Sequence, residues 1–198
     1  MMRITQRWPR LLTLALIIVI NGCGTTQPAK FYLLTPNSNA SPSSSANLSI
    51  GLGPIAFPAY LERSRILVRT SKNTFETAEY HRWAEPLETN FNRVLLQELS
   101  NALPNATVNT YPRRSSQKIN IQVVLEVFSF DTDDNSQAQL NVRWELLGTD
   151  KKPLTAPQQR QYVKAAHSSD YEARVKAMSE CVTALGQELA QEINRNSK

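Results

Sequence analysis

The clearest pattern in the chain is strict alternation of apolar and polar positions in two neighbouring segments. Residues 119–127 and residues 138–146 each carry an apolar side chain at every second position. Such alternation is typical of strands with one buried face. Between them, residues 131–135 (DTDDN) have the composition of a turn. The two segments therefore predict a long antiparallel hairpin that packs one face on the core.

Two other segments carry apolar residues at helical spacing. The first follows Pro86, which suits a helix start, and the second follows a Ser169-x-x-Glu172 capping box. We predict helices over both segments. Their apolar stripes are Leu87, Phe91, Val94, Leu95, Leu99 and Leu103, and then Tyr171, Val175, Met178, Val182, Leu185, Leu189 and Ile193.

Shorter apolar runs predict additional strands, and the last of them reads as an edge strand. These runs are residues 31–34, 48–57, 65–70, 74–80 and 161–166. Strands, a helix, strands and a final helix follow one another along the chain. This order predicts an α+β fold, in which two long helices pack on one face of a mostly antiparallel sheet.

The N-terminal segment has a different character. Three arginines precede an apolar run at residues 11–20, which is shorter than the roughly 20 residues of a membrane-spanning helix and is typical of a signal peptide. The sequence Ile20-Asn21-Gly22-Cys23 then resembles a bacterial lipobox. We expect cleavage before Cys23, which would carry a diacylglycerol and an N-acyl chain.

These features predict three parts of the chain. Residues 1–22 form a cleaved lipoprotein signal peptide. Residues 23–47 hold the lipidated N-terminus, a short strand and a flexible Ser/Asn/Pro-rich segment, and residues 48–196 form a single α+β domain. Three of the 22 basic residues lie in the signal peptide, so the mature chain has 19 basic and 17 acidic residues and no charge excess that favours nucleic acid.

The sequence contains no complete motif of a catalytic, metal or cofactor site, and we expect a protein that is not an enzyme. Residues 51–56 fit G-x-G-x-x-A but lie in a predicted strand, and residues 131–135 lack the rest of a calcium loop. His81 and His167 have no partner at metal-ligand spacing. Cys181 is the one thiol left after lipidation, and we expect it to pack in the core.

One group of residues is not explained by folding alone. Trp and Arg are enriched where proteins meet proteins, so this group predicts a partner contact. Trp83 could instead pin the helix start to the core, and both roles could hold together. The group is Tyr60, Leu61, Arg63, Arg65, Arg82 and Trp83.

Several of these residues, taken in order, resemble the PqiC-like family of ABC-type transport auxiliary lipoproteins. The matching segments are Cys23, residues 31–34, 58–63, 66–69, 82–87 (RWAEPL) and 92–95, Trp144, and residues 171–173 and 178–179. The resemblance implies a periplasmic lipoprotein held in the inner leaflet of the outer membrane. It also implies association with an MCE-domain protein that forms a needle or tunnel for intermembrane lipid transport. A ring of several copies of the chain is compatible with this association.

The position after the lipidated cysteine supports this location. Gly24 stands where an aspartate would hold the protein at the inner membrane. Two other functions stay open: an envelope assembly lipoprotein that activates a cell-wall synthase or serves an export machine, and a stand-alone lipid carrier. The carrier would need an apolar cavity of several hundred Å3, in line with the roughly 300–1,000 Å3 of ligand pockets.

Overall fold

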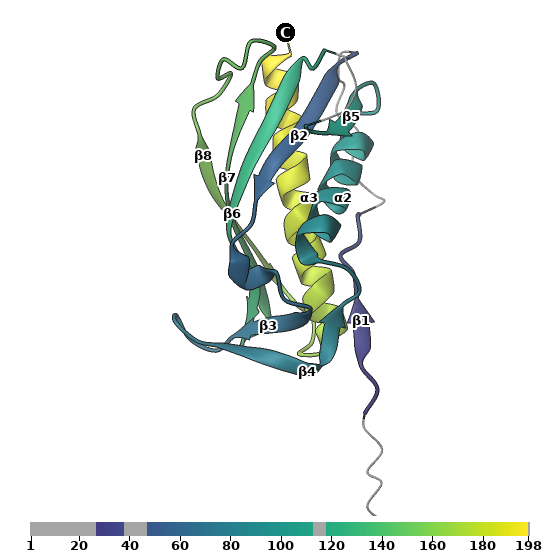
Figure 1. The fold of residues 1–198 in the computed structure, drawn as a ribbon, viewed down its shortest axis with the longest axis vertical. Coiled ribbons are helices and arrows are strands. Elements are labelled where there is room, and N and C mark those ends of the chain that lie inside the picture. Colours follow the sequence, from purple (N-terminus) through teal and green to yellow (C-terminus); the bar gives the residue numbers. More distant parts are fainter. Residues whose placement is uncertain (1–26, 38–46, 113–117, 198) are drawn as a thin grey trace, which may run out of the picture.

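The computed structural model describes residues 27–37, 47–112 and 118–197 of the chain (Figure 1). Cys23, residues 1–22 and most of the Ser/Asn/Pro-rich segment lie outside these ranges. Within them, no helix is both long and apolar enough to cross a lipid bilayer. The strands are β1 (Lys30–Tyr32), β2 (Ser49–Ala56), β3 (Arg65–Arg69), β4 (Phe75–Trp83), β5 (Thr107–Thr110), β6 (Ile121–Asp133), β7 (Gln137–Leu147) and β8 (Gln158–Ala165). The helices are the 3-10 turn η2 (Ala59–Leu61), α2 (Leu87–Ala102) and α3 (Tyr171–Asn196).

Strand β6 organises the sheet because both of its edges are paired. β7 runs antiparallel along one edge, with Leu125 opposite Trp144. β2 and β3 share the other edge, and both run parallel to β6. β8 extends the sheet beyond β7, β5 lies beyond β2, and β4 and then β1 lie beyond β3. The predicted hairpin and the predicted last strand are therefore confirmed.

The α+β class is confirmed, but the described sheet is mixed. The long β6–β7 and β7–β8 pairings and the β3–β4 hairpin are antiparallel, whereas β1–β4, β2–β5, β2–β6 and β3–β6 are parallel. After β2 the chain passes through β3, β4 and α2 before it returns as β5 beside β2. Alternation in the sequence reports which face of a strand is buried, not the direction of its neighbour, and this explains the difference.

Both predicted helices are present and pack against each other and against the sheet (Figure 1). The helices approach closely at Gly186, where a Cβ atom would lie only 2.8 Å from the Glu98 Cβ atom. The predicted stripes form the core except for Tyr171, which packs at its border. Leu103, the last residue of the first stripe, is buried but lies just beyond the last residue of α2.

The predicted capping box at the start of α3 is wrong by one residue. Asp170, not Ser169, is the N-cap, and its carboxylate accepts a hydrogen bond from Ala173 N–H at 2.8 Å. Aspartate is as good an N-cap as serine, so the choice depends on where the chain enters the helix. The Ser169 carbonyl instead accepts from Arg174 Nε at 3.1 Å.

The N-terminal part of the chain belongs to the fold from β1 onward. Residues 30–37 lie against the sheet and both helices, although the sequence places the domain start at residue 48. β1 lies at the end of the molecule that β3 and β4 form, and the C-terminus lies at the opposite end (Figure 1). The chain that leads to Cys23 therefore leaves the domain at the β3–β4 end.

Candidate functional site

The fold brings the six predicted contact residues together from two segments. They are Tyr60, Leu61 and Arg63 in and after η2, Arg65 at the start of β3, and Arg82 and Trp83 at the end of β4. Trp83 N–H donates to the Ser64 carbonyl at 2.7 Å, and Arg65 lies opposite Arg82 in the β3–β4 pairing. Two stretches that are separate in the sequence thus lie side by side in the fold.

The six residues differ in exposure. Leu61 and Trp83 are buried, with 5% and 6% of their surface exposed, and they line a small internal gap together with Leu87. Trp83 therefore pins the start of α2 to the core, and neither side chain offers much surface to a partner. Arg63 and Arg65 are exposed, whereas Tyr60 and Arg82 are half-buried.

Tyr60 belongs to a polar cluster that the sequence did not predict. Asp131 is almost fully buried and receives two hydrogen bonds from Arg69, Nε to Oδ1 at 2.9 Å and Nη2 to Oδ2 at 2.8 Å. The Arg69 guanidinium lies 4.2 Å from the Phe75 ring centroid. Burial, followed by the charge of Asp131, raises the pKa of Tyr60 to about 12. Asp131 is thus a structural ion-pair residue of β6 and not part of the predicted turn.

Polar side chains of the two helices hold the segment after β1 in place. Leu34 is buried, and its N–H donates to Asn90 Oδ1 at 2.6 Å while its carbonyl accepts from Asn90 Nδ2 at 3.2 Å. Thr35 N–H donates to Ser179 Oγ at 3.1 Å. Asn37 N–H donates to the buried Glu98 carboxylate at 2.6 Å. We call this set of contacts the latch, since it fixes the segment that leads from the predicted lipid anchor.

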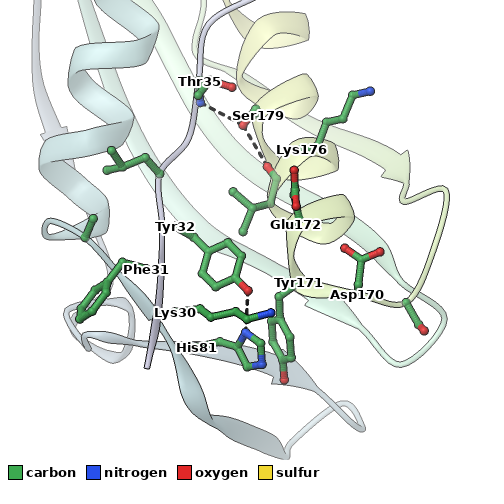
Figure 2. A pocket seen from close by; sticks show the side chains of 14 residues that line it. Lys30, Phe31, Tyr32, Thr35, His81, Asp170, Tyr171, Glu172, Lys176 and Ser179 are labelled. Carbon is green, nitrogen blue, oxygen red and sulfur yellow. Dashed lines mark hydrogen bonds between the residues drawn. The ribbon is translucent and has the colours of Figure 1, made fainter. Parts of the chain in front are cut away.

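An open groove of about 1270 Å3 lies between β1 and the first turns of α3 (Figure 2). Three rings bridge β1, β4 and α3 there: Tyr32 OH is 2.7 Å from His81 Nδ1, and His81 stacks on Tyr171 with ring centroids 3.9 Å apart. Burial and the charge of Lys30 lower the pKa of His81, which favours its neutral ring.

The lining of this groove is mixed. Apolar and aromatic side chains alternate there with two lysines and two carboxylates, namely Lys30, Lys176, Asp170 and Glu172. A stand-alone lipid carrier predicts an apolar cavity instead. The groove therefore does not favour the carrier.

The other motifs have structural explanations. Residues 51–56 lie within strand β2, which leads into the three-residue turn η2, so no helix N-terminus follows them to hold a pyrophosphate. Cys181 is fully buried on α3, and burial raises its pKa to about 12. In the described ranges, no three His, Cys, Asp or Glu residues lie close enough to hold a metal ion.

The latch was missed by sequence reasoning, although a signal for it exists. Asn90 and Glu98 lie on the same apolar face of α2 as Leu87, Phe91 and Val94, and both are buried. Buried polar groups are normally hydrogen-bonded. Polar residues within an apolar stripe thus indicate that another segment of backbone packs there.

The chain is similar in sequence to a family of transport lipoproteins. Residues 32–190 match the sequence model of a family described as ABC-type transport auxiliary lipoprotein component. The intermembrane transport lipoprotein PqiC of Escherichia coli K12 is 24% identical over 194 residues, which cover 96% of this chain and 98% of that protein. The Shigella flexneri protein of the same name gives the same values.

Solved structures share the fold. The crystal structure of an uncharacterized protein gives a TM-score of 0.71 at 20% identity and covers 84% of this chain and 99% of that one. A crystal structure from Xanthomonas campestris gives 0.66 at 16% identity, with 84% and 96% coverage. At these identities the likeness concerns the arrangement of sheet and helices.

Proposed function

This chain belongs to the ABC-type transport auxiliary lipoprotein family, and on that premise we propose that it is the non-catalytic docking subunit of an intermembrane lipid transport system. The family match over residues 32–190 carries the proposal, and the full-length likeness to an intermembrane transport lipoprotein supports it. The partner in this proposal is an MCE-domain protein that forms a needle or tunnel and works with an ATPase and a permease.

Lipid holds the protein to its membrane in this proposal. Cys23 carries the diacylglycerol and the N-acyl chain, and two or more chains anchor a protein stably. Gly24 in place of an aspartate supports the inner leaflet of the outer membrane, with the domain in the periplasm. The latch fits such an anchor, because it fixes residues 34–37 to the two helices, close in sequence to Cys23.

The contact with the transporter uses the turn around η2. Arg63 is exposed there, and Tyr60 is half-buried beside it. Anchoring confines this surface to a thin layer below the membrane and so raises its effective concentration, and a modest intrinsic affinity suffices. Leu61 and Trp83 support the turn from the core.

The test is co-purification of the MCE-domain partner with variants of the lipidated protein. Arg63→Ala should reduce recovery about tenfold, the effect of one moderate contact residue. Tyr60→Phe removes only the hydroxyl and keeps the ring, so the fold should be retained. Any fall in recovery with this variant then reports loss of contact and not loss of folding. Lys152→Ala, an exposed position near the C-terminal end, is the matched control. Full recovery with a Tyr60→Ala, Arg63→Ala double variant that stays folded would exclude this surface.

A further inference from the structure

The point where the chain leaves the domain limits which surface can reach the membrane. Cys23 precedes Lys30, the first residue of β1, by seven positions, which span at most about 25 Å when fully extended. Because the latch holds Leu34 and Thr35, the tether cannot lengthen by peeling off that segment. The β1 end of the domain therefore stays close to the lipid headgroups, provided that Cys23 is lipidated as in the proposed function.

Two large apolar side chains are exposed at this end. Phe31 is 63% exposed and Leu33 is 41% exposed, whereas Leu34, next in the chain, is fully buried. The Phe31 ring points away from the contact of Tyr32 with His81 (Figure 2). Single exposed apolar residues are common, but these two stand on the segment that leads from the anchor.

Two arginines lie in line with Phe31 on the neighbouring strands of the sheet. Phe31 lies opposite Arg82 in the β1–β4 pairing, and Arg82 lies opposite Arg65 in the β3–β4 pairing. Residues directly opposite each other project on the same face, and like charges placed so are unfavourable. Phe31, Arg82 and Arg65 thus form one row across three strands. We call this row, together with Leu33, the outer β1 face.

The two arginines have no anionic partner in the described chain. The ion pairs there use other arginines, namely Arg69, Arg93, Arg143, Arg160 and Arg195. The Arg82 Nε atom is also buried without a hydrogen-bond acceptor. A guanidinium matches the geometry of a phosphate, so this pair of charges suits a phosphate-bearing surface.

We propose that the outer β1 face binds the surface of the membrane that holds the anchor. Phe31 and Leu33 enter the boundary between headgroups and acyl chains, and Arg82 and Arg65 bind lipid phosphates. The occupant is a phospholipid surface because the anchored chain ends here and because apolar side chains stand beside unpaired cations. This assignment separates Arg65 and Arg82 from the transporter contact at Arg63.

The test uses the full lipidated protein in vesicles of phosphatidylethanolamine and phosphatidylglycerol. A part of these lipids carries bromine on the acyl chains near the headgroup. A Phe31→Trp variant adds fluorescence to that of the buried Trp83 and Trp144, and bromine quenches a nearby indole. Val163→Trp, at a 46% exposed position on β8, is the matched control. We expect loss of most of the fluorescence added at position 31 and little loss at position 163.

Further arms make each part falsifiable. Equal quenching at positions 31 and 163 would overturn the proposal. Arg65→Gln with Arg82→Gln should weaken quenching at position 31, and unchanged quenching would remove the arginines from the surface. Unquenched Phe31→Trp with loss of the transporter from a Phe31→Ser, Leu33→Ser variant would assign the face to a protein and overturn the lipid assignment.

The anchor is measured separately, so the two proposals can fail independently. The mass of the peptide that contains Cys23 reports lipidation. An unlipidated cysteine would overturn both the anchor and this surface. A lipidated protein without quenching at position 31 would overturn this surface alone.

Discussion

Leu34 and Asn90 are 56 positions apart in the sequence, yet the backbone of one and the side chain of the other exchange two hydrogen bonds. Leu34 N–H donates to Asn90 Oδ1 at 2.6 Å, and Asn90 Nδ2 donates to Leu34 O at 3.2 Å. Both residues are buried. The segment that follows β1 is thereby fixed to α2.

The first prediction concerns this latch. Asn90→Ala leaves a buried N–H and a buried carbonyl of Leu34 without partners, and each such group costs about 1–3 kcal/mol. We expect the free energy of unfolding in urea to fall by about 2–4 kcal/mol. Thr89→Ala, at the exposed neighbouring position, should change it by less than about 0.5 kcal/mol. Equal effects of the two variants would contradict the latch.

Alkaline pH should destabilise the domain in part through Tyr60. Its pKa is raised to about 12 in the fold, mainly by burial, while an unfolded tyrosine ionises near pH 10. Because the folded state holds the proton longer, this contribution is complete below about pH 10 and is lost between about pH 10 and 12. Tyr60→Phe should therefore flatten the fall of the urea midpoint in that window. Parallel curves for wild type and Tyr60→Phe would show that Tyr60 ionises freely.

Two glycines of β2 should respond differently to alanine. Gly53 has φ of 125°, and an added Cβ would lie 2.4 Å from the Tyr111 carbonyl oxygen. At Gly51 the nearest atom is the Ile119 Cδ1 methyl at 2.7 Å, the end of a side chain that can move. Gly53→Ala should cost about 2 kcal/mol or more of unfolding free energy, and Gly51→Ala clearly less. The opposite order in urea unfolding would contradict this account of the strand.

The thiol of Cys181 should be inert in the folded protein. It is fully buried between α3 and the sheet, where its Sγ atom lies 3.6 Å from the carbonyl oxygens of Ala138 and Tyr162. Its pKa of about 12 leaves almost no thiolate at neutral pH. A maleimide reagent should label the lipidated protein only after unfolding in urea. Rapid labelling without urea would place Cys181 in an accessible site.

The spacing of apolar residues predicted those helices and strands that bury one face in the core. The β6–β7 hairpin and both long helices follow from apolar spacing alone, because each packs one face on the core. β5 was not predicted, since its four residues TVNT show no apolar alternation and the strand depends on pairing with β2. Pairing direction likewise depends on distant partners.

The candidate site was predicted less completely. The sequence brought the residues around Tyr60 and Trp83 to attention, and the fold joins them through Ser64. It could not show that Trp83 is buried, because an aromatic residue before a helix fits a core and a contact surface equally well. The pairing of Arg69 with Asp131 joins residues 62 positions apart and has no local signal.

The most direct measurement is the identification by mass spectrometry of proteins that crosslink to the lipidated chain in intact envelopes. The proposed function predicts an MCE-domain protein together with its ATPase and permease. Recovery of cell-wall synthesis or export proteins in their place would contradict the role in lipid transport, and recovery of bound lipid without any protein would favour the carrier.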